Sequence, residues 1–236
     1  MLGVMSEGFK VDFLGIGAEK AGTTWLADCL AEHPEVGIPS IKELFYFHAI
    51  DPHFLTEKHE WYMRGKEWYA QQFREVAKKK LKGEFSPTYL YDAIAAQRMK
   101  HDFPGVKLII ALRHPVERAF SQYIHDKRLG VLLDIPFEEA LKRHHSYGEK
   151  GLYFKHLQRY EKIFGRENML VILQEDIRQD PEEVLKHVYD FIGVENKDFI
   201  PQRAFEKSNS AQETRFAFVN YMMVHTEYVL GRLRMQ

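Results

Sequence analysis

The chain has 236 residues, 45% of them hydrophobic, and a formal net charge of −1 at pH 7. This length suits one domain with a full core, and the balanced charge argues against a general nucleic-acid binder, which normally carries a basic excess. The single cysteine, Cys29, excludes an intramolecular disulfide and favours a reducing compartment. No stretch reaches the roughly 20 apolar residues of a membrane span, and the first residues lack the apolar segment of a signal peptide. We therefore expect a soluble, cytoplasmic protein.

Strand and helix patterns alternate along the sequence. Buried strands are predicted near residues 11–17, 81–85, 106–112 and 168–174. Helices are predicted over residues 23–32, 93–101, 116–128, 137–145, 152–164 and 181–191, with a further helical stretch from residue 211 onward. This alternation predicts an α/β fold with a mostly parallel central sheet flanked by helices.

A phosphate-binding turn is predicted after the first strand. The apolar run over residues 11–17 leads through Ala18-Glu19-Lys20-Ala21-Gly22-Thr23-Thr24-Trp25 into an amphipathic helix. Such a turn aims unpaired backbone N–H groups and the positive end of the helix dipole at one point, where an anion can bind. Lys20 adds a full charge, and the hydroxyls of Thr23 and Thr24 add donors. An ordinary strand-to-helix turn with a solvated lysine is the alternative.

The spacing of this turn differs from that of nucleotide triphosphatases. Their loop, G-x-x-x-x-G-K-[ST], places Lys directly after the second Gly. Gly17 and Gly22 have the same separation, but Thr23 stands in the place of that Lys and Lys20 lies inside the loop. The displaced Lys followed by Gly-Thr-Thr-Trp resembles the 5′-phosphosulfate loop of sulfotransferases that use 3′-phosphoadenosine 5′-phosphosulfate (PAPS). The resemblance implies that the phosphosulfate is bound by Lys20, Ala21, Gly22, Thr23, Thr24 and Trp25.

A second anion-binding motif follows the strand predicted over residues 106–112, in the run Arg113-His114-Pro115-Val116-Glu117-Arg118-Ala119-Phe120-Ser121-Gln122-Tyr123. Arg113 would lie at the carboxyl end of that strand and Ser121 about two turns into the next helix, so both can face the crevice in which open α/β sheets bind ligands. The Arg-x-Pro-x-x-Arg-x-x-Ser-x-Tyr pattern resembles the segment of the same family that binds the 3′-phosphate, with Arg113 and Ser121 as its ligands. A helix cap with a surface arginine is the alternative.

The candidate catalytic base lies in Lys42-Glu43-Leu44-Phe45-Tyr46-Phe47. In the branches of the family that sulfate glycans, a Glu shortly before a pair of aromatic residues is the general base, and Glu43 matches it. Apolar neighbours that exclude water can turn a carboxylate into a base near neutral pH. A surface ion pair between Glu43 and Lys42 is the alternative. The pattern departs from those branches at Phe45, where they have His or Gln, and at His48, where one has Asp.

A second carboxylate lies in Gly83-Glu84-Phe85-Ser86-Pro87-Thr88-Tyr89, which resembles the family's Glu-Lys-Ser/Thr-Pro-x-Tyr stretch beside the sulfate. Phe85 stands where that stretch has Lys. Glu84 is predicted to be either a second catalytic carboxylate or an orienting partner for Lys20, with a structural role at the strand end as the alternative. His48 and His125 are further candidate bases, although in a chain with twelve histidines each one alone is more often structural.

The resemblance extends over about residues 11–195. It implies that Tyr153 contacts the nucleotide, with a tyrosine of the core as the alternative. The family also has a basic loop that closes over the 3′-phosphate, for which Arg203, Lys207 and Arg215 are the candidates. Relatives continue past such a loop to one more helix and a closing Trp, so we expect a single domain over residues 1–236 with a shortened C-terminal part.

Together the two motifs predict a P-loop-like sulfotransferase with PAPS as donor and 3′-phosphoadenosine 5′-phosphate (PAP) as product. It would transfer a sulfuryl group to a hydroxyl of a carbohydrate or other small metabolite, with Glu43 as base, Lys20 as stabiliser of the leaving oxygen and no metal ion. One alternative is a phosphotransferase that uses ATP and Mg²⁺, which needs a Lys after Gly22. The other is a nucleotide-binding module without turnover. The acceptor and the oligomeric state stay open.

Overall fold

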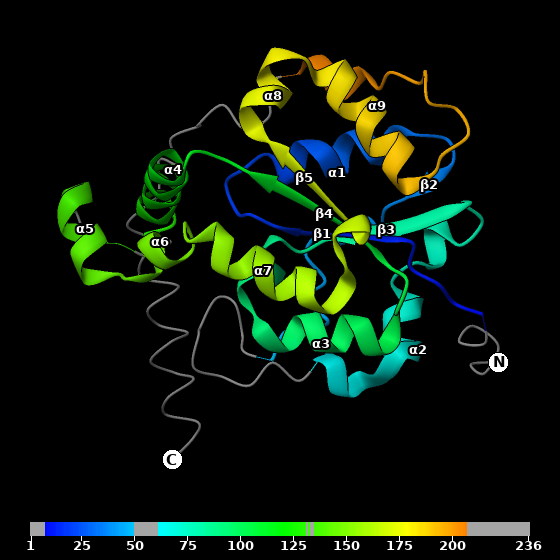
Figure 1. Cartoon of the computed structure of the whole chain (residues 1–236), viewed down its shortest axis with the longest axis horizontal. Coiled ribbons are helices and arrows are strands. Elements are labelled where there is room, and N and C mark those ends of the chain that lie inside the picture. Colours follow the sequence, from blue (N-terminus) through cyan, green and yellow to red (C-terminus); the bar gives the residue numbers. More distant parts are fainter. Residues whose placement is uncertain (1–7, 50–60, 131, 133–134, 207–236) are drawn as a thin grey trace. The chain divides into compact units, whose positions relative to one another are not determined.

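The computed structural model describes residues 8–49, 61–130, 132 and 135–206 (Figure 1). The chain divides into two compact units, one of Met1–Arg113 with Tyr153–Ser208 and one of His114–Leu152 with Asn209–Gln236. The single domain expected over residues 1–236 stays a prediction, as does its shortened C-terminal part. The helical stretch predicted from residue 211 lies outside the described residues.

The first unit is built around a five-stranded sheet in the order β2-β3-β1-β4-β5. Its strands are β1 (Phe13–Gly17), β2 (Val36–Gly37), β3 (Leu81–Phe85), β4 (Lys107–Leu112) and β5 (Met169–Leu173). All neighbouring pairs are parallel, which confirms the predicted α/β fold with a parallel sheet. All five residues of the central strand β1 are buried, because helices cover both faces of a parallel sheet. The chain goes from β1 to β2 on one side of the sheet and from the neighbouring strand β4 to β5 on the other, so a ligand crevice is expected at the carboxyl ends of β1 and β4.

Helices cover the two faces of this sheet (Figure 1). One face carries α1 (Thr23–Glu32), α8 (Gln174–Gln179) and α9 (Pro181–Ile192), and the other carries α2 (Gly65–Gln71), α3 (Ala93–Asp102) and α7 (Tyr153–Phe164). This division follows from right-handed crossovers, because the chain moves in opposite directions along the sheet after β1 and after β3. Short 3₁₀ helices complete the unit: η1 (Trp61–Arg64), η2 (Arg74–Val76), η3 (Pro87–Tyr91), η4 (Arg166–Asn168) and η5 (Gln202–Phe205).

The second unit contains the helices α4 (Pro115–Arg128), α5 (Phe137–Arg143) and α6 (Ser146–Glu149). They pack around a small core of Ala119, Tyr123, Leu132, Ala140 and Tyr147. Arg118, the second arginine of the anion-binding pattern, is fully buried in this unit and donates to the Tyr147 carbonyl at 2.6 Å. Arg118 therefore holds α4 to α6 rather than facing solvent.

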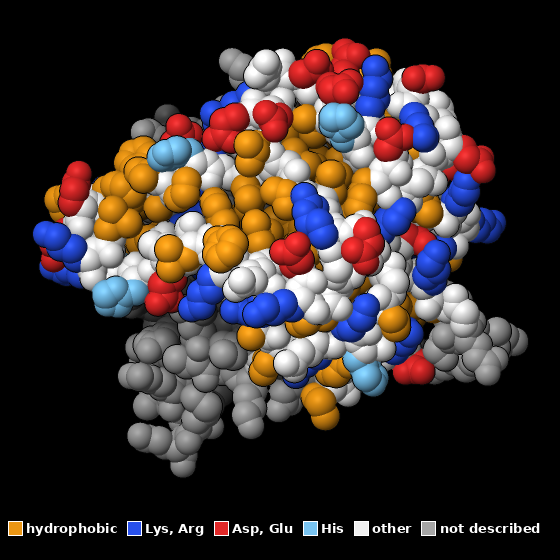
Figure 2. Space-filling model, in the orientation of Figure 1, with side chains coloured by type: hydrophobic (Ala, Val, Ile, Leu, Met, Phe, Trp, Pro, Cys, Tyr) orange, Lys and Arg blue, Asp and Glu red, His pale blue; other side chains and the backbone are white. Residues whose placement is uncertain are grey.

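The predicted elements are present with small shifts at their ends. The helix over residues 23–32 and the strand over residues 81–85 have the predicted bounds. The strand predicted to residue 174 ends at Leu173, because Gln174 begins α8. The described residues contain no helix that is both long and apolar enough to pass through a membrane. On the visible face, side chains of both signs are interspersed (Figure 2), in keeping with the small net charge.

Candidate active site

The turn between β1 and α1 forms a cradle at the carboxyl end of the central strand. Gly22 is the N-cap of α1 with a φ of 96°, and the helix begins at Thr23. The N–H groups of the first helical turn have no acceptor within the helix, and the positive end of its dipole points the same way. Lys20 lies inside the turn with a φ of 64°. The structure thus brings residues 20–25 together in the geometry that suits an anion.

Neighbouring elements hold this cradle from two sides. On the β4 side, the Ala18 N–H donates to the Ala111 carbonyl at 2.5 Å. On the other side η3 packs against the last residue of β1: a Cβ at Gly17 would lie 2.7 Å from the Leu90 Cβ and 2.9 Å from the Pro87 carbonyl oxygen. Only glycine permits so close an approach, so η3 and the cradle are in direct contact.

Arg113 is attached to the cradle. It follows β4, and its Nη1 donates to the Lys20 carbonyl at 3.4 Å. Tyr153, the first residue of α7, donates its hydroxyl to the Arg113 carbonyl at 2.9 Å. Arg113 and Tyr153 are therefore connected to the cradle, and Tyr153 also packs against the hydrophobic core, in keeping with the alternative prediction of a core tyrosine. Contact of either residue with the nucleotide stays a prediction. Ser121 lies on α4 of the second unit, and its contact with the same phosphate stays a prediction.

Residues 43–49 form an irregular loop, named here the base loop. Glu43 is half-buried, and both Glu43 and Phe45 have positive φ angles, 55° and 49°. Left-handed backbone is uncommon for residues other than glycine and persists only where the surroundings impose it. Lys42, just before the loop, lies 3.9 Å from the Asp28 carboxylate on α1. The conformation of the loop is therefore a product of tertiary contacts.

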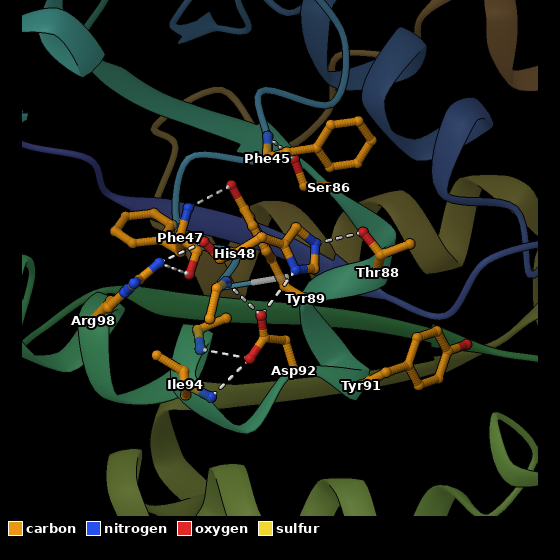
Figure 3. Close-up of polar contacts among 12 residues, drawn as sticks. Phe45, Phe47, His48, Ser86, Thr88, Tyr89, Tyr91, Asp92, Ile94 and Arg98 are labelled. Atoms are coloured by element: carbon orange, nitrogen blue, oxygen red, sulfur yellow. Dashed lines mark hydrogen bonds and ion pairs between the residues drawn. The ribbon is translucent and has the colours of Figure 1, made fainter. Parts of the chain in front are cut away.

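Three side chains on one side of η3 hold the base loop (Figure 3). They belong to Ser86, Tyr89 and Asp92, three residues apart, and a 3₁₀ helix has three residues per turn. Their oxygens accept hydrogen bonds from three backbone N–H groups of the loop: Phe45 to Ser86 at 3.2 Å, Phe47 to Tyr89 at 3.4 Å, and Ala49 to Asp92 at 2.8 Å. From α3, Arg98 donates to the carbonyls of Phe47 and His48.

His48 fills the space between the base loop and η3. Its Nδ1 lies 3.0 Å from Asp92 Oδ2, and its Nε2 lies 2.6 Å from Thr88 Oγ1. Asp92 also caps α3 by accepting from the N–H groups of Ile94 and Ala95. Burial alone would raise the pKa of Asp92, but hydrogen bonds from His48 and from backbone N–H groups lower it to about 2. An ionised Asp92 only accepts, so the Nδ1 of His48 carries a proton.

Glu84 lies in β3 beneath the base loop and is only 2% exposed. Its carboxylate accepts from the hydroxyls of Ser86 at 2.8 Å and Tyr69 at 3.4 Å. Burial raises the pKa of Glu84 to about 7 against the lowering effect of these hydrogen bonds, and the charge of Glu43 raises it as well. Enclosure of this kind supports the structural role that the sequence left open, because a buried carboxylate does not reach an acceptor. The catalytic role of Glu84 stays a prediction.

Phe85 packs in the core where the family pattern has Lys. It is 5% exposed, and a Cβ at Gly15 of β1 would lie only 1.9 Å from its Cδ1. Gly15 and Phe85 are partners in the register of β1 and β3. The Phe85 ring therefore occupies the space that is open because Gly15 has no side chain. Phe85 is a core residue.

The other candidate residues belong to other elements. His125 is on α4 of the second unit. Arg203 lies in η5, which is attached to α1 because the indole N–H of Trp25 donates to the carbonyls of Arg203 and Ala204 at 3.2 and 3.3 Å. The guanidinium of Arg203 forms an ion pair with the Glu32 carboxylate, with 3.8 Å between Nε and Oε1. Lys207 and Arg215 lie outside the described residues.

Sequence reasoning missed the residues that hold the base loop. Ser86 and Tyr89 belong to the stretch that resembles the family pattern, but their role in holding the loop was not predicted, and Asp92 lies outside that stretch. The three-residue spacing of Ser86, Tyr89 and Asp92 around Pro87 is a usable signal for a 3₁₀ helix with one polar side. Among the described residues, no three His, Cys, Asp or Glu side chains are grouped as metal ligands. The expectation of a metal-free reaction stays a prediction.

The sheet order and the cradle at its central strand define a P-loop-like α/β protein. The sulfotransferase domain family matches residues 10–228, and the chain belongs to this family. It is 31% identical over 189 residues to heparan sulfate glucosamine 3-O-sulfotransferase 3B1 of Mus musculus, covering 76% of this chain and 45% of that protein. It is 24% identical to the membrane-associated sulfotransferase kil1 of Dictyostelium discoideum, covering 94% of this chain and 65% of that protein.

Among solved structures, the sulfotransferase of Alicyclobacillus acidocaldarius has a TM-score of 0.74 and 31% sequence identity, over 94% of this chain and 96% of that one. This likeness confirms the family that the cradle and the Arg113 motif indicated, together with its fold. The chain spans less than two thirds of the two curated relatives, 65% and 45% of their lengths.

Proposed function

We propose that this protein transfers a sulfuryl group from PAPS to a hydroxyl of a carbohydrate, with PAP as the second product. The observation that carries the proposal is the pair of cationic groups at the carboxyl ends of the adjacent strands β1 and β4. Lys20 lies inside the cradle, and Arg113 is hydrogen-bonded to the Lys20 carbonyl at 3.4 Å. A donor with a phosphosulfate at one end and a phosphate at the other needs two such groups close together.

The residues have complementary roles in this reaction. The N–H groups at the start of α1 bind the 5′-phosphate, and Arg113 binds the 3′-phosphate. As the acceptor oxygen forms its bond to sulfur, the bond from sulfur to the bridging oxygen breaks. Negative charge develops on that bridging oxygen, and the ammonium group of Lys20 stabilises it.

Glu43 takes the proton of the attacking hydroxyl. It is the accessible member of a pair of interacting carboxylates, because Glu84 is enclosed under the base loop. A pKa of about 7 leaves Glu84 partly protonated near neutral pH, which relieves the repulsion that a second full charge would exert on Glu43. The similarity to the mouse heparan sulfate glucosamine 3-O-sulfotransferase supports a carbohydrate as acceptor.

The test combines binding with transfer. Calorimetry should show tight binding of PAP and much weaker binding of ATP, because Thr23 stands where an ATP-binding loop has its Lys. Labelled PAPS is then offered with desulfated glycans and with simple alcohols. Binding of ATP in preference to PAP would favour the phosphotransferase alternative, and binding of PAP without transfer to any acceptor would favour a nucleotide-binding module.

The variant Glu43→Gln tests the base. Because general base catalysis contributes about 100-fold or more, the transfer rate should fall by at least about that factor while PAP binding stays unchanged. Glu161→Gln, at an exposed position of α7, is the matched control and should transfer at the wild-type rate. Wild-type transfer by the Glu43 variant would rule out its role as base.

A further inference from the structure

His48 is enclosed by the elements that it joins. It is 3% exposed, and its partner Thr88 is 8% exposed. Its two ring nitrogens are hydrogen-bonded to Thr88, near the start of η3, and to Asp92, just after its end (Figure 3). The imidazole also packs near the rings of Tyr89 and Phe45, with centroid distances of 4.9 and 5.7 Å. Removing it would take the His48 partner from the buried Thr88 hydroxyl and one hydrogen bond from Asp92, whose carboxylate would still accept from the N–H groups of Ala49, Ile94 and Ala95.

The 3₁₀ helix η3 connects this histidine to both halves of the active site. On one side η3 packs against Gly17, the residue that begins the cradle, through Pro87 and Leu90. On another side its polar residues hold the base loop, in which Glu43 has a left-handed φ of 55°. The distance from the base to the cradle is therefore set through η3, and the bonds of His48 belong to that connection.

Resting on the proposed role of Glu43 as base, we propose that His48 is a positioning residue, which pins the base loop onto η3 through Asp92 and Thr88 and so places Glu43 relative to the cradle. His48 itself does not contact the reacting atoms. Its effect is geometric, and geometry matters here because a misplacement of about 1 Å can cost about 100-fold in rate.

The directions of the hydrogen bonds define informative variants. The Nδ1–H of His48 donates to the ionised Asp92, and Nε2 forms the second hydrogen bond, with the Thr88 hydroxyl at 2.6 Å. His48→Asn places an amide N–H near the position of Nδ1 and keeps the bond to Asp92. His48→Leu has a similar volume and removes both bonds. His101→Asn, at an exposed position at the end of α3, is the matched control.

The first measurement separates positioning from folding. We expect His48→Leu to lower kcat by up to about 100-fold, with PAP affinity unchanged because the cradle is untouched. His48→Asn should recover part of that loss, and His101→Asn should equal the wild type. Each rate is expressed per folded molecule, with thermal unfolding as the measure of stability. A variant His48→Leu that is less stable but has wild-type kcat per folded molecule would overturn the proposal.

The second measurement asks whether His48 acts through Glu43. In a double-mutant cycle, the loss of rate caused by His48→Leu should disappear in the Glu43→Gln background, because a base that is absent cannot be misplaced. An equal loss in both backgrounds would overturn the positioning role. If Glu43→Gln alone transfers at the wild-type rate, the base assignment of the proposed function fails. That outcome differs from a His48→Leu variant that transfers at the wild-type rate while Glu43→Gln is slow.

Amide hydrogen exchange supplies a readout that needs no sulfuryl transfer. In His48→Leu, exchange should accelerate in the peptide that covers residues 43–49, because the bonds from Phe45, Phe47 and Ala49 to η3 lose their support. Exchange in residues 18–25 should stay as in the wild type. Unchanged protection of residues 43–49 would overturn the proposal whatever the activity of the wild-type protein.

Discussion

The cradle and the base loop lie against the same 3₁₀ helix but are built in different ways. The cradle is one continuous strand, turn and helix over residues 13–32, and its anion-binding groups are mainly backbone N–H groups. The base loop has no regular structure and takes its shape from Ser86, Tyr89 and Asp92, some forty positions later in the chain. The geometry of a site built from backbone N–H groups depends on few side chains. The conformation of a loop held by side chains depends on residues that are distant in the sequence.

The largest effect is expected at the one cradle side chain that acts in the reaction. Lys20→Ala should slow transfer by at least about 100-fold, since loss of one donor at a developing charge costs about 2.7 to 4 kcal/mol. The free energy of unfolding should hardly change, because the turn is held by the Ala18 N–H and by Arg113. Steady-state rates and urea unfolding measure the two effects. Lys78→Ala, on an exposed residue, is the control, and near-normal turnover of Lys20→Ala would refute this role.

A smaller effect is expected at the second cation. Arg113→Ala should weaken PAP binding by roughly ten- to 100-fold, the worth of a charge-assisted hydrogen bond of about 1.5 to 3 kcal/mol. Binding of adenosine 5′-phosphate, which lacks the 3′-phosphate, should fall far less. Calorimetry with both ligands tests the difference, with the exposed Arg74→Ala as control. Equal losses for the two nucleotides would place the 3′-phosphate elsewhere.

A further effect, on stability rather than on rate or binding, concerns the carboxyl group of Glu84. Because burial raises the pKa of Glu84 from 4.5 to about 7, the folded protein holds this proton more tightly than the unfolded chain does. Glu84 therefore lowers the free energy of unfolding as pH rises between these two values, by at most about 1.4 kcal/mol per pH unit. Glu84→Gln cannot titrate, so its stability relative to the wild type should increase over that range. Urea unfolding across the range tests this, and parallel curves for both proteins would contradict it.

The comparison also shows where sequence reasoning succeeds. The bounds of α1 and the residues of the cradle follow from local patterns. An apolar strand, a glycine turn and a helical period can each be recognised from consecutive residues. The same holds for Arg113 at the end of β4. By contrast, β2 has two residues and α8 has six, too few for a periodic pattern to appear.

The sequence by itself determined the alternating α/β architecture, the family and the chemical groups that surround the cradle, since each of these depends on residues that are neighbours along the chain. Only the tertiary structure decided that Phe85 fills the space over Gly15, that Glu84 is enclosed, and that His48 joins Asp92 to Thr88. The physical reason is that burial and side-chain hydrogen bonds depend on which distant segments the sheet brings together. No local sequence pattern predicts which distant residues form these contacts.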